Sequence, residues 1–460
     1  MTRWPAAVGV CVITACGGGP ESWDGFVYYA DTPHEGYEYA IRQAGLEETA
    51  LGYEWITAGR VALTRALSVD PPYEEVGYLD PLEAGAMGFK VSAERGQLLR
   101  IEVEMESDDP SRVFLDLFRV MDDTLRPHRH EAYADSSERS LDFFVRRTGD
   151  YVLRVQPELL RGGRYRIRII TASSLGFPVE GHGVTAIRSV YGDPRDGGRR
   201  EHQGVDIFAP RGTPVLAAED GRVSRVRNGG LGGKTVWLRD RFGQSLYYAH
   251  LDSQAVRRNQ EVRRGDTLGF VGNTGNARTT PPHLHFGIYS RGAYNPFASL
   301  NPLPTDPPRL AADTATVGGW ARTVVDGLRV RRSPGRRGDI LGELNRNTPM
   351  LVVGGAGSWF RVLLPDGVMG FVAAASVEPA TRPLRNADLS DGGMLLGGPT
   401  PTAAIRDSIA PGSRVLVFGE FEGFLFVQGS QGPPGWLPLD SGMIFSPTRA
   451  GVAAAGDGTT

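Results

Sequence analysis

The stretch Pro282-His283-Leu284-His285-Phe286 alternates imidazole and apolar side chains. A period of two is typical of a β-strand with one face buried. On such a strand His283 and His285 project to the same side, because successive side chains point to opposite faces. At the rise of a β-strand they lie about 6.6 Å apart along the chain. The stretch therefore predicts a strand with two histidines on one face and core residues on the other.

Two further stretches in the same part of the chain carry similar side chains. They are His202-Gln203-Gly204-Val205-Asp206, which we expect to be a loop that enters a strand, and Tyr248-Ala249-His250-Leu251. Imidazole nitrogen and carboxylate oxygen are ligands that suit zinc, and a catalytic zinc uses three protein ligands and one open position. Five candidates exceed that need, so the surplus can supply acid–base groups. Taken singly, each residue also fits a structural role, such as a satisfied histidine or a turn cap.

Further blocks in the same order make the pattern specific to one family. Residues 197–286 resemble the lysostaphin/LytM-type zinc metallopeptidases, and the blocks besides those quoted above are Gly197–Glu201, Ala209–Val215, Ala218–Val223 and Gly272–Gly275. The resemblance implies an antiparallel all-β peptidase core that cleaves peptide bonds of peptidoglycan. It implies one Zn²⁺ per peptidase domain, with His202, Asp206 and His285 as ligands. It also implies that His250 and His283 flank the open position as acid–base or transition-state groups.

The sequence departs from the family at one point and leaves the substrate contacts open. Some members place a tyrosine shortly before the first histidine, but residues 192–201 contain none, and Tyr191 fits the turn of the opening strand. Arg199 and Arg200 either bind a substrate carboxylate or form a solvated surface. Gly232, within a glycine-rich run, is expected to line the substrate groove.

The composition indicates a multidomain protein that is mainly β. The chain has 460 residues, too many for one typical core, and its 61 glycines and 32 prolines favour short strands joined by turns. Residues 186–300 hold 17 basic and 10 acidic side chains, although the whole chain has a net charge of −3. This segment either attracts an acidic polymer or presents a solvated arginine surface. No nucleic-acid partner is expected.

The N-terminus has the pattern of an export signal. Met1–Ala15 combines a basic residue, an apolar stretch and small residues at its end, and the following Cys16 completes a sequence similar to a bacterial lipobox. We expect cleavage before Cys16, lipidation of this cysteine and anchoring to the membrane of the cell envelope. An ordinary secreted protein or a misassigned start codon are the alternatives.

The rest of the chain divides into modules. Asp31-Thr32-Pro33 has the pattern of a helix start, and short alternating strands later in the chain are typical of a small sandwich, with Gly149–Val155 similar to pre-peptidase sandwiches. Arg346–Gly354 recurs as Pro411–Gly419, which indicates two repeats that resemble bacterial SH3-like barrels. The expected divisions are a signal peptide at 1–15, a linker and helices at 16–78, a β-sandwich at 79–172, the peptidase at 173–303, a proline-rich linker at 304–318, SH3-like repeats at 319–380 and 381–445, and a disordered tail at 446–460.

The sequence thus predicts an exported zinc metalloendopeptidase that acts on peptidoglycan. One alternative is a catalytically silent scaffold or amidase activator that binds the cell wall. Another is an extracellular peptidase that acts on protein substrates. No residue of the implied ligand set is missing, which favours the enzyme over the scaffold, and regulatory protein partners are left open.

Overall fold

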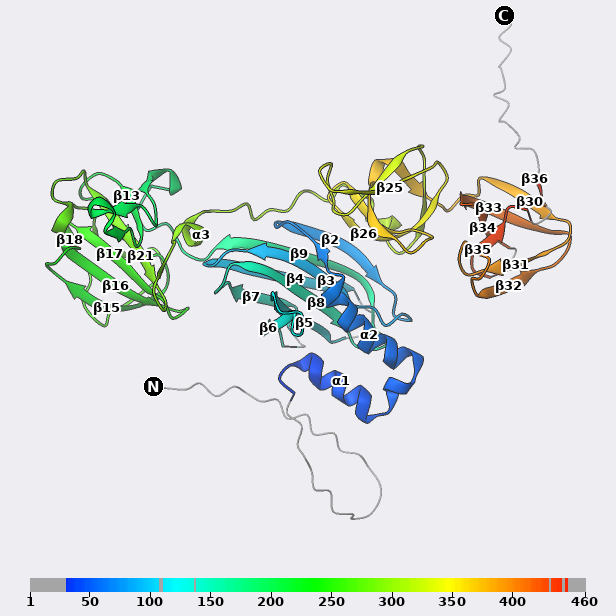
Figure 1. Cartoon of the computed structure of the whole chain (residues 1–460), viewed down its shortest axis with the longest axis horizontal. Helices are drawn as coiled ribbons and strands as arrows, with labels where there is room; N and C mark the ends of the chain where they lie inside the picture. Colours follow the sequence, from blue (N-terminus) through cyan, green and yellow to red (C-terminus); the bar gives the residue numbers. More distant parts are fainter. Residues whose placement is uncertain (1–29, 107–110, 136–137, 430–431, 441–442, 446–460) are drawn as a thin grey trace, which may run out of the picture.

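The computed structural model describes residues 30–106, 111–135, 138–429, 432–440 and 443–445 (Figure 1). The expected signal peptide, Cys16 and the tail at 446–460 lie outside the described residues. Within them, no helix combines the length and apolar character needed to cross a bilayer. The protein is mainly β and multidomain, as predicted.

Two short helices come first, as the cap at Asp31-Thr32-Pro33 predicts. They are α1 (Pro33–Gln43) and α2 (Ala50–Thr64), and the Thr32 hydroxyl accepts a hydrogen bond from the backbone of Glu35. Trp55 of α2 is buried, and its indole donates to the Pro157 carbonyl in the adjacent sheet. His34 of α1 stacks on Trp55 with ring centroids 4.7 Å apart. The helical hairpin therefore packs on the sandwich through an aromatic cluster.

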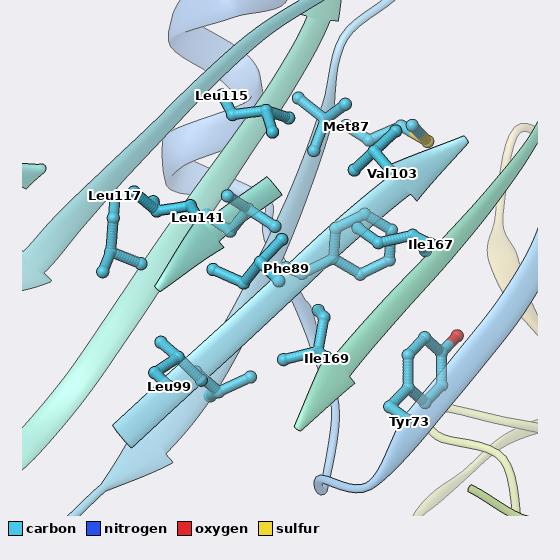
Figure 2. Packing of buried hydrophobic residues seen from close by; sticks show 14 of the residues in the cluster. Tyr73, Met87, Phe89, Leu99, Val103, Leu115, Leu117, Leu141, Ile167 and Ile169 are labelled. Atoms are coloured by element: carbon cyan, nitrogen blue, oxygen red, sulfur yellow. The ribbon is translucent and has the colours of Figure 1, made fainter. Parts of the chain in front are cut away.

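The sandwich encloses its core between two sheets. One sheet has the order β1-β3-β8-β5-β6, and the other contains β2-β9-β4-β7. Figure 2 shows Phe89, Leu99 and Ile167 meeting in the core between them. The strands are β1 (Leu67–Ser68), β2 (Tyr73–Leu79), β3 (Met87–Ala93), β4 (Gln97–Glu106), β5 (Val113–Val120), β6 (His128–Tyr133), β7 (Ser140–Phe144), β8 (Gly149–Pro157) and β9 (Gly163–Ser173).

The sandwich begins earlier in the chain than residue 79. Strand β2 lies in the segment 16–78, where the sequence predicts helices and a linker, yet it pairs with β9 along its full length. The strand is not evident from the sequence because Glu74 and Glu75 interrupt its alternation of apolar residues. Glu75 is fully buried, which is rare for an acidic side chain unless it is paired.

The segment expected to be the peptidase, residues 173–303, packs a large antiparallel sheet on a small one. The large sheet has the order β10-β13-β21-β17-β16-β15-β19, the small one β14-β20-β18, and β11-β12 forms a separate hairpin. The elements are β10 (Ile187–Ser189), β11 (Pro194–Arg195), β12 (Arg200–Glu201), β13 (Val205–Phe208), β14 (Pro214–Leu216), β15 (Gly221–Arg227), β16 (Lys234–Asp240), β17 (Ser245–Leu251), β18 (Ser253–Gln254), β19 (Glu261–Val262), β20 (Thr267–Phe270), β21 (His283–Tyr289), β22 (Ala293–Tyr294) and α3 (Phe297–Leu300).

The two C-terminal repeats have the same order of strands. The first contains β23 (Trp320–Thr323), β24 (Leu328–Arg331), β25 (Ile340–Leu344), β26 (Pro349–Ala356), β27 (Trp359–Leu363), β28 (Met369–Ala373) and β29 (Val377–Pro379). The second contains β30 (Arg385–Leu389), β31 (Gly393–Leu396), β32 (Ile405–Ile409), β33 (Ser413–Phe421), β34 (Phe424–Gln428), β35 (Gly435–Pro438) and β36 (Met443–Phe445). Short 3₁₀ helices span Leu46–Glu48, Val184–Ala186, Asp196–Gly198, Gly275–Ala277, Thr314–Thr316 and Ala374–Ser376.

The first repeat takes in part of the expected linker and packs against the second repeat. Ala312 and Val317, which fall in the segment 304–318, are buried in the core of the first repeat. Trp320 of the first repeat packs on Phe426 of the second, with ring centroids 4.3 Å apart. The two repeats are thus joined by an aromatic interface.

The sandwich and the first repeat share one continuous sheet of eleven strands. Strand β2 pairs with β9 on one side and with β26 on the other, where Val76 lies opposite Gly355. Next to this pairing, Arg361 of β27 donates two hydrogen bonds to the Glu75 carboxylate, at 3.1 and 2.8 Å. The hydroxyls of Tyr73 and Tyr165 donate to the same carboxylate. A fully hydrogen-bonded ion pair therefore lies at the junction of the two domains.

We predict that Glu75→Gln weakens this junction. The change would leave the Arg361 guanidinium buried without its anion, at a cost of about 3–5 kcal/mol. We expect proteases to cleave earlier in the chain segment that leads into the first repeat. We also expect a lower midpoint of thermal unfolding. Glu102→Gln is the control, because that side chain is 48% exposed and such surface pairs contribute about 1 kcal/mol or less. Equal effects of the two variants would contradict a role for the buried pair.

We also predict that acid loosens the helical hairpin. Burial lowers the pKa of His34 from 6.5 to about 4, with a further effect from Arg154. A histidine with a lowered folded pKa contributes stability that is present above its unfolded pKa and is lost as the pH falls through the folded pKa. The loss between pH 6.5 and pH 4 is roughly 3 kcal/mol. Hydrogen exchange of residues 33–64 should accelerate in this range, and His34→Phe should remove most of that pH dependence.

Candidate metal centre

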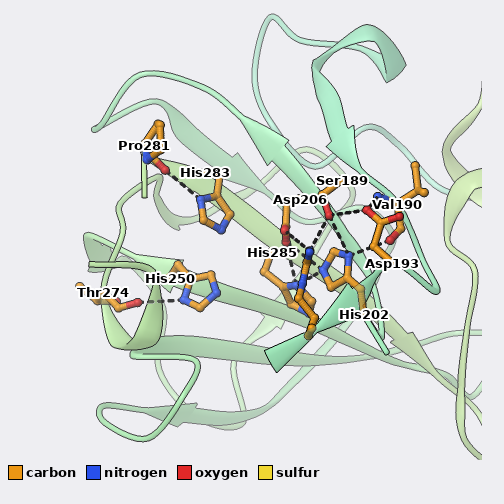
Figure 3. Close-up of polar contacts among 11 residues, drawn as sticks. Ser189, Val190, Asp193, His202, Asp206, His250, Thr274, Pro281, His283 and His285 are labelled. Atoms are coloured by element: carbon orange, nitrogen blue, oxygen red, sulfur yellow. Dashed lines mark hydrogen bonds and ion pairs between the residues drawn. The ribbon is translucent and has the colours of Figure 1, made fainter. Parts of the chain in front are cut away.

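Antiparallel pairing of β13 and β21 brings Asp206 and His285 together. Asp206 lies directly opposite His285, and His202 comes from the loop that leads into β13. Nε2 of His202 lies 2.9 Å from Nδ1 of His285, and each of these atoms lies 3.0 Å from Oδ1 of Asp206 (Figure 3). Three potential ligand atoms thus meet at one point.

The chemistry of these three atoms fits a metal cation. Burial opposes ionisation of Asp206, yet the adjacent His202 and His285 hold its pKa below the usual range, so the carboxylate is charged at neutral pH. Burial lowers the pKa of His285, which disfavours a second proton on that ring. Nδ1 of His202 donates to the Val190 carbonyl at 2.8 Å, which leaves its Nε2 as a lone-pair donor. One carboxylate and two imidazoles form a donor set suited to zinc.

Residues outside the ligand set orient it. Nη2 of Arg195 donates to Oδ2 of Asp206 at 2.9 Å, which leaves Oδ1 for the ligand cluster. The Ser189 hydroxyl donates to Asp193 at 2.8 Å and lies 3.3 Å from Nδ1 of His202. Such partners fix the orientation of metal ligands. Sequence reasoning missed all three residues. The turn-forming run Gly192-Asp193-Pro194-Arg195 was a local signal for Asp193 and Arg195 but not for Ser189.

Gly204 leaves space for the His285 ring. A Cβ atom on Gly204 would lie 2.4 Å from the Phe286 carbonyl oxygen and 2.8–2.9 Å from two atoms of the His285 imidazole. All three distances are shorter than a normal contact of a Cβ atom. Glycine at this position is therefore required by the close approach of β21 to the loop that carries His202.

His250 and His283 stand beside the cluster with one ring nitrogen each available. Nδ1 of His250 donates to the Thr274 carbonyl at 2.8 Å, and Nδ1 of His283 donates to the Pro281 carbonyl at 2.9 Å. The opposite side of each ring faces the cavity, so Nε2 can accept or donate a proton there (Figure 3). The two ring centroids are 5.1 Å apart. Burial lowers the pKa of His250 to about 4, so this ring is neutral at pH 7.

The backbone at His250 is held in an uncommon conformation. Its φ of 62° lies in the left-handed region, which a non-glycine residue seldom adopts. Its N–H donates to the Gly232 carbonyl at 2.8 Å, so the glycine-rich loop holds the strand end in place. Strain of this kind persists where the surrounding structure enforces it, and it is concentrated at functional sites.

A cavity of about 730 Å³ opens over the cluster. All described residues that line it fall between positions 189 and 289, so they belong to the domain that carries the cluster. Arg200 and Gly232 line the cavity, whereas Arg199 is exposed and is not among the lining residues.

The cavity also contains two tyrosines that sequence reasoning did not single out. Tyr247 and Tyr289 line it, whereas the Tyr191 hydroxyl donates to the Ala293 carbonyl away from it. Strand alternation could have placed Tyr247 at the site. Tyr247 lies on the same face of its strand as Ala249, and Ala249 is paired with His285 in the neighbouring strand.

Comparison with known proteins gives two family matches. Residues 200–296 match peptidase family M23, and residues 326–378 match a bacterial SH3 domain. An L-Ala–D-Glu endopeptidase of Bacillus subtilis is 35% identical over 136 residues, which are 28% of this chain and 41% of the relative. The DD-carboxypeptidase/endopeptidase Mpg of Neisseria meningitidis is 39% identical over 134 residues, which are 28% of this chain and 30% of the relative.

A solved structure is similar to the same part of the chain. The catalytic domain of the antimicrobial peptidase lysostaphin from Staphylococcus simulans is 34% identical, with 24% of this chain and 88% of that domain covered and a TM-score of 0.22. The chain spans less than half the length of the curated relatives named above. Residues 200–296 of this chain belong to peptidase family M23, and residues 326–378 are a bacterial SH3 domain.

Proposed function

We propose that the protein is a zinc-dependent endopeptidase that hydrolyses peptide bonds of peptidoglycan. The observation that carries the proposal is the convergence of His202, Asp206 and His285 beside two histidines whose Nε2 atoms face the same cavity. The family match supports peptide-bond hydrolysis, and the names of the relatives above support a peptide of the cell wall as substrate.

In this proposal His202, Asp206 and His285 hold one Zn²⁺. Bound zinc supplies Lewis acidity toward water and toward the scissile carbonyl. Neutral Nε2 of His250 or His283 accepts a proton from the attacking water and returns it to the leaving amine. The second imidazole, when both of its ring nitrogens carry a proton, donates a hydrogen bond from Nε2 to the oxygen on which negative charge develops. The two carbonyl acceptors, on Thr274 and Pro281, keep both rings turned toward the cavity.

The remaining modules fit an enzyme of the cell envelope. We propose that the signal peptide at 1–15 directs export and that lipidated Cys16 anchors the protein to a membrane. The SH3-like repeats would hold the peptidase against peptidoglycan, and Arg200 and Gly232 would contact the peptide in the groove.

The second candidate function is that of a non-catalytic scaffold or amidase activator. The complete donor set disfavours it, because a scaffold has no need for three converging ligands and two oriented histidines. Hydrolysis of protein substrates would use the same site and differs only in which peptide fits the cavity.

We predict that zinc binding and hydrolysis depend on His285. His285→Ala removes one of three ligands, so the zinc content should fall below one ion per chain and the hydrolysis of purified muropeptides should be lost. Chelation of the wild-type protein should give the same loss, and added zinc should reverse it. His182→Ala is the matched control, because the ring of that histidine bonds to the nearby Glu180 carbonyl and does not line the cavity. Hydrolysis that survives chelation would refute the mechanism, and absence of zinc would favour the scaffold.

We predict that Gly204→Ala damages the same site without removing a ligand. The added methyl group would overlap the His285 ring and the Phe286 carbonyl, so the ring must move. We expect at least a tenfold loss of zinc affinity, as for changes in the shell around a metal, measured by competition with a chelating dye. Gly183→Ala is the control, because a Cβ there meets nothing within 4 Å. Unchanged affinity in Gly204→Ala would show that the site tolerates displacement of His285.

A further inference from the structure

Three aromatic side chains continue the floor of the cavity along the large sheet. Tyr247 of β17 lies directly opposite Trp237 of β16 in the antiparallel pairing, so both side chains project from the same face. Tyr289 projects from that face as well, because it lies four residues beyond His285 on strand β21. The alternate residues of these strands form the core on the opposite face. The candidate metal centre and the three aromatic residues therefore share one face of the sheet.

The aromatic rings pack side by side and stay partly exposed. The ring centroids of Trp237 and Tyr247 are 4.3 Å apart, and those of Trp237 and Tyr289 are 5.3 Å apart. The Tyr247 ring also meets the His285 imidazole, with centroids 5.7 Å apart. Both tyrosines line the cavity, and none of the three side chains is fully buried. We call Trp237, Tyr247 and Tyr289 the aromatic platform.

The polar atoms of the platform are available to a ligand. The hydroxyls of Tyr247 and Tyr289 and the indole N–H of Trp237 form no hydrogen bond with any described residue. Partial burial raises the pKa of Tyr247 to about 12 and also raises the pKa of Tyr289, so both hydroxyls are protonated at neutral pH. A protonated hydroxyl can donate and accept. The platform thus combines apolar ring faces with three free hydrogen-bonding groups.

The charges near the platform favour a neutral ligand over a cation. Aromatic faces attract ammonium groups as well as apolar ones. However, Arg225 lies directly opposite Trp237 on β15 and is exposed there. Segment 186–300 as a whole carries 17 basic and 10 acidic residues. A cationic side chain of a peptide would therefore be repelled from the platform.

We propose that the aromatic platform binds a sugar ring of the glycan strand that carries the cleaved peptide. A pyranose ring presents C–H groups on its faces and hydroxyls around its edge. The C–H groups fit the electron-rich faces of the aromatic rings, and the hydroxyls fit the three free polar groups.

The position of the platform allows the sugar and the peptide to be bound at the same time. Strand β16, which carries Trp237, lies two strand spacings from β21, or about 10 Å. A sugar on Trp237 therefore leaves the space above His285 to the peptide. The platform rests on the proposed function and goes beyond it, because it makes the sugar a part of the substrate that the site recognises.

The test compares muropeptides that carry their disaccharide with the same peptides after an amidase has removed it. The full-length protein digests both forms, and kcat and KM are measured for each. We expect the sugar-bearing form to be favoured about tenfold in kcat/KM, the value of one stacking contact and one hydrogen bond. Trp237→Leu keeps an apolar side chain but removes the ring face, so it should abolish most of this preference through KM and leave the zinc content unchanged. Tyr289→Phe removes only a hydroxyl and should reduce the preference roughly threefold.

Phe297→Leu is the matched control, because that ring is 40% exposed and does not line the cavity. It should keep the full preference for the sugar-bearing form. The platform is overturned if the wild type cleaves both forms equally or if Phe297→Leu loses as much preference as Trp237→Leu. It is also overturned if Trp237→Leu slows both forms to the same extent, since that result would indicate a contact with the peptide.

A binding measurement separates the platform from the proposed function. The peptide-free disaccharide is titrated into the full-length wild type, Trp237→Leu and Tyr289→Phe, and binding is followed by NMR. Weaker binding to the two variants supports the platform even if no peptide is hydrolysed, a result that would contradict the proposed function alone. Absence of binding to the wild type, or equal binding to all three proteins, overturns the platform. If Trp237→Leu does not fold, the comparison of Tyr289→Phe with the wild type decides.

Discussion

The antiparallel register between β13 and β21 is the constraint on which the candidate site depends. It places Asp206 opposite His285 and Phe208 opposite His283, so two strands supply most of the polar groups that meet over the large sheet. The opposite faces of the same strands carry Ile207, Leu284 and other residues of the core. A slip of one residue would exchange these faces. Burial of the core therefore fixes the positions of the site residues, and the polar groups need no separate mechanism to converge.

Much of this site could be predicted from sequence because its determinants are local. The alternation from His283 to Phe286 assigns both histidines to one face, and Gly204 marks the loop that leads to Asp206. The family's order of motifs then assigns different roles to His283 and His285. The structure gives a physical basis for that difference, since His285 points Nδ1 at Asp206 whereas His283 uses Nδ1 to donate to a carbonyl.

The missed features depend on contacts between distant residues. Strand β2 is hard to recognise in the sequence because Glu75 occupies a core position. The partner of Glu75, Arg361, lies 286 residues away in the chain. No local hydrophobic periodicity indicates an ion pair between residues so far apart in the chain. Arg195 was missed for a related reason: its role follows from the position of Asp206 and from the register of a hairpin with only two residues in each strand. Turn residues indicated that the chain bends there but did not indicate what the bend brings together.

The shared sheet also has a mechanical consequence. Strands β2 and β26 run antiparallel at the boundary between the sandwich and the first repeat, and the Glu75–Arg361 pair lies beside them. A force directed along the strands that separates the two domains would act on these hydrogen bonds in shear. All of them would then bear the load at the same time and would not break one after another. The buried ion pair would resist the same displacement, because sliding would expose charges that have lost their partners. The junction is thus built to transmit tension between the two domains and not to yield as a hinge.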